Sequence, residues 1–161
     1  MTDKINFNEE QQELARERRV RYEKIVSAMD TLRTICHGDN KAAGWWTDIK
    51  TGKNLTFNYQ QRMVDGTLTI EQMFTAVNKV GLIHTEVSEA LEAFRKNLMD
   101  DKIPDFTGFE TEIIDTIVRC FDILGGLNLR GSYCMFEKLE FNRSRNDHKP
   151  EERKKKGGKL F

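Results

Sequence analysis

The chain contains little that would cross-link it or bind soft metals. It has only two prolines and three cysteines in 161 residues, and Cys36, Cys120 and Cys134 form neither a C-x-x-C pair nor a cluster with paired histidines. An odd number of cysteines without such spacing indicates neither a disulfide framework nor a zinc site. We therefore expect a fold held by a hydrophobic core, in a reducing, cytoplasmic setting.

The sequence also lacks an excess of either charge and any long apolar run. Lysine and arginine number 26, and so do aspartate and glutamate, so no overall field attracts nucleic acid or an anionic membrane. No apolar stretch approaches the roughly 18 residues of a membrane span. We expect a globular chain without membrane contact, and its length indicates a single domain over residues 1–161.

Hydrophobic periodicity divides the first part of the chain into a helix and an irregular segment. Apolar residues at three- and four-residue steps predict an amphipathic helix over residues 10–36, whose charged first half would project or contact a partner subunit. Over residues 37–68 the periodicity is lost and glycines recur. Connections of this length are unusual in compact domains unless they are functional, so we expect a lid-like segment there.

Two capping boxes predict the central helices. Thr69, followed three residues later by glutamine, opens a helix expected to run to about Asn97. Thr107, followed three residues later by glutamate, opens a helix expected to end at Gly125 and Gly126. These two helices should form an antiparallel hairpin.

The remaining residues complete an all-α prediction. A further helix is expected from Ser132 to about Arg145, followed by a basic tail over residues 147–161. No alternating pattern is long enough to predict a sheet. Four helices with short to moderate connections are typical of a helical bundle, with its central helices over residues 69–146.

Two glutamates on the first hairpin helix lack a counter-charge on that helix. Glu86 and Glu89 have no cation three or four residues onward, whereas Glu92 has Arg95 and Lys96. On a helical wheel Glu86 lies beside an apolar stripe, and Glu92 points to solvent. The stripe consists of Ile83, Val87, Ala90, Leu91 and Phe94. Glu86 and Glu89 must therefore be neutralised from elsewhere.

Glu112 and Asp115 repeat the three-residue spacing on the second hairpin helix. Glu112 has no cation at either offset, and Asp115 has Arg119. The pair lies on the more polar side of its helix, so the wheel singles it out less clearly. If the hairpin brings both pairs together, four carboxylates converge, which is costly unless they are protonated or bind a cation.

The chemistry of these four side chains points to a hard divalent cation. Carboxylate oxygens without histidine or thiol ligands suit Mg²⁺ or Mn²⁺, which serve phosphate chemistry by offsetting charge and activating water. The alternative for either acidic pair is a solvated helix surface without metal. A ferritin-like di-iron bundle would need E-x-x-H pairs, and the chain has none.

The spacing of the two acidic pairs resembles a family signature. Glu86-Val87-Ser88-Glu89, 22 intervening residues and Glu112-Ile113-Ile114-Asp115 resemble the E-x-x-E, spacer, E-x-x-D pattern of the MazG-like all-α nucleoside triphosphate pyrophosphohydrolases. The residues that flank both pairs resemble phage and bacterial members. So do the segment from Glu137 to Arg145 and the final residues from Gly157 to Phe161. The similarity covers roughly Gly44 to the C-terminus.

The resemblance implies a MazG-like four-helix bundle with an additional N-terminal helix, assembled as a homodimer or homotetramer. It implies hydrolysis of (deoxy)nucleoside triphosphates to monophosphate and pyrophosphate, with water attacking the α-phosphorus. Glu86, Glu89, Glu112 and Asp115 would hold Mg²⁺, with Mn²⁺ as an alternative, and one of them or a neighbour would activate the water. It does not imply which nucleotide is preferred.

Residues outside the acidic pairs are candidates for phosphate contacts. Lys138, Asn142 and Arg145 fall at i, i+4 and i+7, on one helical face, and would bind the triphosphate. The alternative is a solvated basic face. Lys96 would also reach phosphate, although its pairing with Glu92 favours a surface role.

Aromatic and polar residues near the expected site have two interpretations each. Trp45 and Trp46 would stack on a base or seal the pocket, or else anchor a loop to the core. Asp122 is expected on a solvated surface, with support of the metal ligands as the alternative. His84 is expected to be a packed or surface residue and not a general base.

Two other classes of function stay open. A non-catalytic helical interaction module would use the charged N-terminal helix and the basic tail to bind a partner, and would need no metal. Nucleic-acid binding through the C-terminal lysines would be salt-sensitive, but the neutral net charge argues against it.

Overall fold

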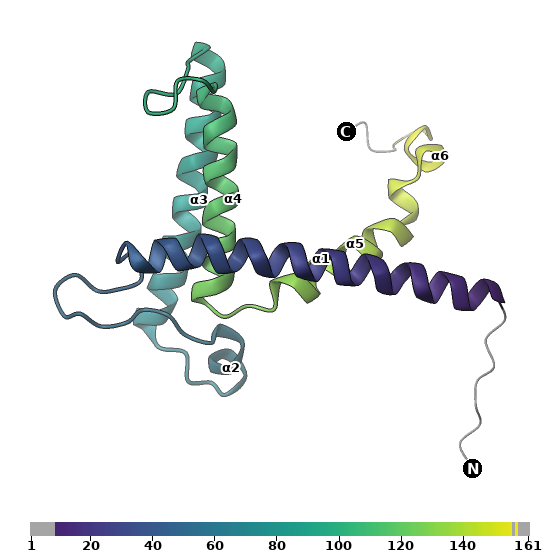
Figure 1. Ribbon diagram of the computed structural model, residues 1–161, viewed down its shortest axis with the longest axis horizontal. Coiled ribbons are helices and arrows are strands. Elements are labelled where there is room, and N and C mark those ends of the chain that lie inside the picture. The colour runs from purple at the N-terminus through teal and green to yellow at the C-terminus, as the bar shows by residue number, and fades with distance from the viewer. Residues whose placement is uncertain (1–8, 156, 158–161) are drawn as a thin grey trace. The chain divides into compact units, whose positions relative to one another are not determined.

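The computed structural model describes residues 9–155 and residue 157, and the regular elements of this part of the chain are all helices (Figure 1). The all-α prediction is confirmed for these residues, and none of their helices is long and apolar enough to cross a membrane. Residues 156 and 158–161, in the predicted basic tail, lie outside the described residues. The elements are α1 (Glu9–Ala42), α2 (Tyr59–Val64), α3 (Ile70–Lys96), α4 (Gly108–Gly126), α5 (Gly131–Ser144), the 3-10 helix η1 (Asn146–His148) and α6 (Pro150–Arg153).

The chain divides into two compact units. The hairpin unit is Thr31–Arg130, and the terminal unit comprises the chain up to Asp30 and from Gly131 onward. Helix α1 begins in the terminal unit and ends in the hairpin unit. The extent of the predicted domain, residues 1–161, stays a prediction.

Helices α3 and α4 form the predicted hairpin, and both capping boxes are present. The Gln72 N–H donates to Thr69 Oγ1 (3.2 Å), and the Thr69 N–H donates back to Gln72 Oε1 (3.1 Å). Thr107 and Glu110 exchange the same two bonds at the start of α4. The two helices run side by side (Figure 1). Among the described helices they are the pair with the most extensive mutual contact, and the predicted four-helix bundle stays a prediction.

Short side chains and one acid line the contact between α3 and α4. Ala90, Ala93 and Glu86 are buried there, and a Cβ added at Gly108 would lie 3.0 Å from Ala93 Cβ. Larger side chains of the predicted stripe remain exposed beside this contact, although the Phe94 ring also meets the Phe109 ring of α4. Three of them are 47–67% exposed: Val87, Leu91 and Phe94.

Helix α1 is longer than predicted. It continues to Ala42 instead of ending at residue 36, so the irregular segment begins at residue 43, and α2 interrupts it. The apolar periodicity stops before this extension, but its polar side chains find partners. Asn40 Nδ2, for example, donates to the backbone oxygen of Cys36 (2.9 Å).

The segment after α1 is tied to the end of α4. The Phe57 N–H donates to the Gly126 oxygen and the Tyr59 N–H to the Leu127 oxygen, both at 3.0 Å. This part of the predicted lid is therefore held by backbone hydrogen bonds. Its role as a lid stays a prediction.

Trp46 lies at the centre of the core of the hairpin unit. It is fully buried and packs with Ile123 and Leu127. Partly buried residues surround these three: Leu55, Phe57, Tyr59, Ala76, Ile83 and Leu129. Trp46 therefore anchors its loop to the core, and its indole offers no face on which a base can stack.

Asp122 is also in this core, and the expectation that it lies on a solvated surface is wrong. It is 1% exposed. Its Oδ1 accepts a hydrogen bond from Trp46 Nε1 (2.6 Å) and lies 2.9 Å from His37 Nδ1, and its Oδ2 lies 3.7 Å from Lys79 Nζ. These partners come from α1, the following loop and α3, which a wheel of α4 alone does not include.

Lys79 completes the group around Asp122. Its ammonium donates to the backbone oxygen of Trp45 (3.0 Å) and lies 4.3 Å from the centroid of the Trp46 ring. Burial lowers the pKa of Lys79, and the neighbouring carboxylate of Asp122 opposes that effect. A cation, an indole and a histidine thus offset the burial of one carboxylate.

Gly125 and Gly126 lie inside the last turn of α4, where their lack of a side chain permits close contacts. A Cβ at Gly126 would lie 2.1 Å from the Trp46 ring, and one at Gly125 would lie 2.4 Å from the His37 side chain. The two glycines do mark the end of the helix, as predicted. The structure shows why glycine is present at these two positions: any side chain there would overlap the His37 or the Trp46 ring.

The terminal unit is organised around Phe136 of α5. The Tyr22 ring meets the Phe136 ring edge-to-face, with centroids 5.0 Å apart, and the Arg18 guanidinium lies 5.2 Å from the Phe136 centroid. Arg18 and Arg21 of α1 also form ion pairs with Glu140 (3.7 and 3.5 Å). The charged first half of α1 is therefore engaged by α5 of the same chain.

We predict that Gly126→Ala destabilises the protein. The added methyl group overlaps the Trp46 ring, and overpacking of this kind costs about 3 kcal/mol. Urea unfolding followed by far-UV circular dichroism measures the loss.

Gly81→Ala is the matched control, since Gly81 lies within α3 with no atom within 4 Å of the added Cβ. Alanine there should stabilise the helix by about 0.5–1 kcal/mol. Equal stability of the two variants would contradict the assigned role of Gly126.

Candidate metal centre

The hairpin brings three of the four predicted acids together. Glu86 and Glu89 of α3 and Glu112 of α4 each offer one carboxylate oxygen, and these oxygens all lie within 4.8 Å of one another. Glu86 is buried, Glu112 is half-buried and Glu89 is exposed. The acidic triad, as we call these three residues, thus opens to solvent on the side of Glu89.

Arg119 of α4 provides the counter-charge of Glu86, whereas the sequence spacing had paired it with Asp115. Its Nε donates to Glu86 Oε1 at 2.8 Å, across the hairpin, and not to Asp115 on its own helix. Glu86 is therefore neutralised from the neighbouring helix. Neither Glu89 nor Glu112 has an ion pair among the described side chains.

The environment of Glu112 disfavours its charged form. Burial raises the pKa of Glu112, and the neighbouring charges of Glu89, Asp115 and Glu86 raise it further. A bound cation would reverse this repulsion, because it favours the charged form of each ligand.

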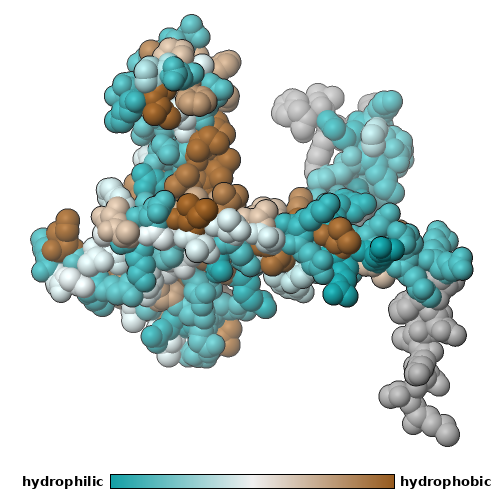
Figure 2. All heavy atoms as spheres, in the orientation of Figure 1, coloured by the Kyte–Doolittle hydropathy of each residue, from teal (hydrophilic) through white to brown (hydrophobic). Residues whose placement is uncertain are grey.

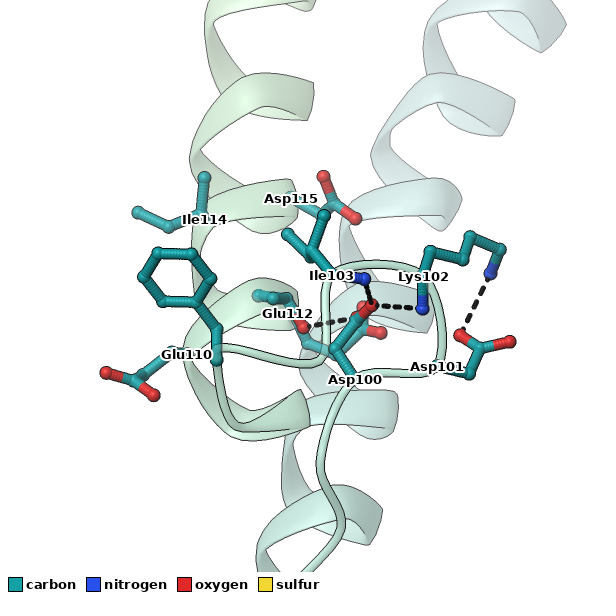
Figure 3. A pocket seen from close by; sticks show the side chains of 10 residues that line it. Asp100, Asp101, Lys102, Ile103, Glu110, Glu112, Ile114 and Asp115 are labelled. Carbon is teal, nitrogen blue, oxygen red and sulfur yellow. Dashed lines mark hydrogen bonds and ion pairs between the residues drawn. The ribbon is translucent and has the colours of Figure 1, made fainter.

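Asp115 does not belong to the acidic triad. It lies one turn beyond Glu112 on α4 and lines a cavity with it (Figure 3). Burial raises the pKa of Asp115, as does Glu86, while Arg119 opposes the shift. Its role as a fourth ligand stays a prediction.

The donors of the triad are of the kind that can hold a hard divalent cation. All its donors are carboxylate oxygens, which Mg²⁺ and Mn²⁺ prefer. Oxygens bound to Mg²⁺ at about 2.1 Å lie at most about 4.2 Å apart, so the observed spacing requires only small side-chain adjustments. The residues therefore fit a divalent cation.

Glu92 and Lys96 have the surface positions expected for them. Lys96 Nζ lies 2.6 Å from Glu92 Oε1, and Arg95 lies 3.8 Å from the same carboxylate. Glu92 therefore has two cations and no place in the triad. Trp45, unlike its neighbour in the core, is more than half exposed.

The three residues predicted to bind phosphate lie in the terminal unit and do not share one helical face. Lys138 and Asn142 are on α5, but the helix ends at Ser144, and Arg145 adopts an extended conformation. The Arg145 guanidinium donates two hydrogen bonds to Asp147 (2.9 and 2.6 Å). Contact of these residues with substrate stays a prediction.

No protein-family model, no curated protein and no solved structure matches the chain. The likeness of the two acidic pairs to the MazG-like signature therefore stays a prediction. A functional assignment depends on the geometry of the hairpin.

We predict that Glu112→Gln raises the melting temperature of the metal-free protein at neutral pH by a few degrees. The pKa of Glu112 is higher in the folded than in the unfolded state, so its charge opposes folding at a pH above both values. That penalty disappears as the pH falls below the unfolded value. The gain should therefore shrink toward about pH 4. Thermal unfolding in the presence of a chelator measures both effects.

Glu110→Gln tests whether the gain is specific to the triad. Glu110 is on the same helix, but the pKa of this carboxyl is lowered by hydrogen bonds with Thr107. Its charge favours folding, so glutamine at this position should give no stabilisation. A similar gain in both variants would show that repulsion within the triad is not its cause.

Proposed function

We propose that the chain is a Mg²⁺-dependent pyrophosphohydrolase of (deoxy)nucleoside triphosphates, of the MazG-like type. The observation that carries the proposal is the convergence of the E-x-x-E and E-x-x-D segments on one side of the hairpin, where three carboxylates lie within ligand distance of one another. The products would be a nucleoside monophosphate and pyrophosphate.

The four acids would hold the metal in the proposed reaction. Glu86, Glu89 and Glu112, with Asp115, hold Mg²⁺, or alternatively Mn²⁺, which when bound offsets charge on the phosphoryl oxygens and lowers the pKa of water. The hydrogen bond from Arg119 to Glu86 Oε1 orients the Glu86 carboxylate. Arg119 contacts only this oxygen, and the other would bond to the metal.

Glu89 is the acid best placed to orient the attacking water. It is the exposed member of the triad and has no ion pair among the described residues. The water oxygen would form a bond with the α-phosphorus, and the bond from that phosphorus to the bridging oxygen would break. The electron pair would leave with pyrophosphate.

We predict that Glu89→Gln lowers kcat/KM by about 100-fold or more, the scale of losing one charge-stabilising group at such a site. Wild-type protein is incubated with a panel of nucleoside triphosphates and Mg²⁺ in ¹⁸O-labelled water. The expected products are pyrophosphate and a monophosphate that carries the label, identified by ³¹P NMR and mass spectrometry.

Glu92→Gln is the control, because Glu92 is on the same helix and is engaged by Lys96 and Arg95. It should retain near wild-type activity. Equal loss in both variants would count against the assigned site. Release of orthophosphate and a diphosphate would show that a different bond is cleaved. Absence of both turnover and metal binding would favour the helical interaction module.

We also propose that a second copy of the chain covers the exposed apolar side of the hairpin, which completes a four-helix bundle. Figure 2 shows hydrophobic residues gathered along α3 and α4. On α3 the exposed residues recur with the spacing of a helix–helix seam. Those that follow this spacing from the middle to the end of the helix are Val77, Val80, Val87, Leu91 and Phe94. The two hairpins of a dimer would supply four helices.

We predict a mass of twice or four times 18.8 kDa for the wild-type protein by size-exclusion chromatography with light scattering. Leu91→Glu should shift the protein to a monomer, because a buried charge in the seam is costly. Asn78→Glu introduces the same charge beside the seam on the same helix and should leave the assembly intact. A monomeric wild-type protein would contradict the proposal.

A further inference from the structure

A cavity of about 420 Å³ adjoins the acidic triad on the side of the loop between α3 and α4 (Figure 3). Its volume is within the range of about 300–1,000 Å³ typical of small-molecule sites. Glu112 and Asp115 form part of its wall, and Glu112 also belongs to the triad. A ligand in the cavity would therefore adjoin a metal bound by these acids.

The loop that forms the opposite wall is held in a fixed conformation. Asp100 Oδ1 accepts hydrogen bonds from the N–H groups of Lys102 and Ile103, both at 2.8 Å, and its Oδ2 accepts one from Thr111 Oγ1 (2.8 Å). The second contact ties the loop to α4. An isolated antiparallel bridge between Met99 and Thr107 closes the loop at its base. The cavity is thus preformed.

Apolar side chains line the cavity next to charged ones. Ile103 and Phe106 of the loop and Ile114 of α4 line the cavity, and each is more than half exposed. Because Ile103 and Phe106 are exposed to solvent, they contribute little to the core of the hairpin. These side chains offer a surface to a flat, weakly polar ring.

We propose that this cavity is the nucleobase subsite, in which the base of the nucleotide packs on Phe106 between Ile103 and Ile114. The inference rests on the proposed function, because a nucleoside triphosphate combines an anionic chain for the metal with a planar ring for the apolar wall. Stacking on an aromatic side chain tolerates any base. The subsite therefore recognises the presence of a base.

Methyl NMR of the wild-type protein tests the subsite without turnover. The isoleucine δ1 methyl groups are labelled with ¹³C, and AMP, GMP, CMP and UMP are added with Mg²⁺. The ring current of a bound base should shift the resonances of Ile103 and Ile114. Ile49, which is 97% exposed and does not line the cavity, should not shift. Ribose 5-phosphate, which has no base, should shift none of the three.

Kinetics of two matched variants give the second measurement. Phe106→Ala should raise KM for nucleoside triphosphates about 10-fold, the scale of losing one stacking contact, with little change in kcat. It should leave the hydrolysis of inorganic tripolyphosphate unchanged. Phe74→Ala removes another exposed phenylalanine, which does not line the cavity, and should alter the kinetics with neither substrate.

The two proposals fail separately. If the enzyme releases pyrophosphate but no monophosphate shifts Ile103 or Ile114, the subsite is wrong and the activity stands. If both methyl groups shift but no triphosphate is hydrolysed, the nucleotide site stands and the activity is wrong. Equal effects of Phe106→Ala on nucleotides and on tripolyphosphate would also overturn the subsite.

Discussion

The arrangement of the hairpin unit depends on one buried carboxylate. Asp122 meets His37 of α1, Trp46 of the following loop and Lys79 of α3. A carboxylate removed from water is tolerated only with donors and a cation around it. Asp122 therefore holds α1, the following loop and α3 together at the C-terminal part of α4. The acids of the triad lie further along α3 and α4, so their relative positions depend on the same alignment of these two helices. The contacts of Asp122 thus help to set the distances on which the proposed metal site depends.

The close contact of α3 with α4 has a cost elsewhere on the surface. Alanines and a glycine let the two backbones approach, and the contact leaves Glu86 buried between the helices. The longer apolar side chains of α3 stay largely exposed, and they remain in water unless another surface covers them. The close packing of α3 on α4 thus brings the acids of the triad together and leaves a row of apolar side chains exposed on α3.

The sequence predicted local features well and contacts across elements poorly. Capping boxes depend on neighbours within a few residues, so the beginnings of α3 and α4 could be predicted, and α3 ends next to Asn97 as expected. Asp122 and Arg119 were misplaced because their partners lie on other helices, and a wheel contains no information about those. A signal existed for Asp122: two glycines at the end of α4 and a tryptophan before α2 indicated a site of close approach. Nothing in the pattern paired Arg119 with Glu86.

The pairing of Arg119 with Glu86 determines how much charge the site presents to a metal. Three carboxylates alone would repel one another strongly in a half-buried position. The guanidinium compensates one of them, which leaves Glu89 and Glu112 as the members of the triad without an ion pair among the described residues. Because Arg119 engages Glu86 through only one oxygen, the arginine orients this acid without blocking it. The same contact therefore stabilises the hairpin in the absence of metal and reduces the repulsion that a cation would have to offset at the proposed site.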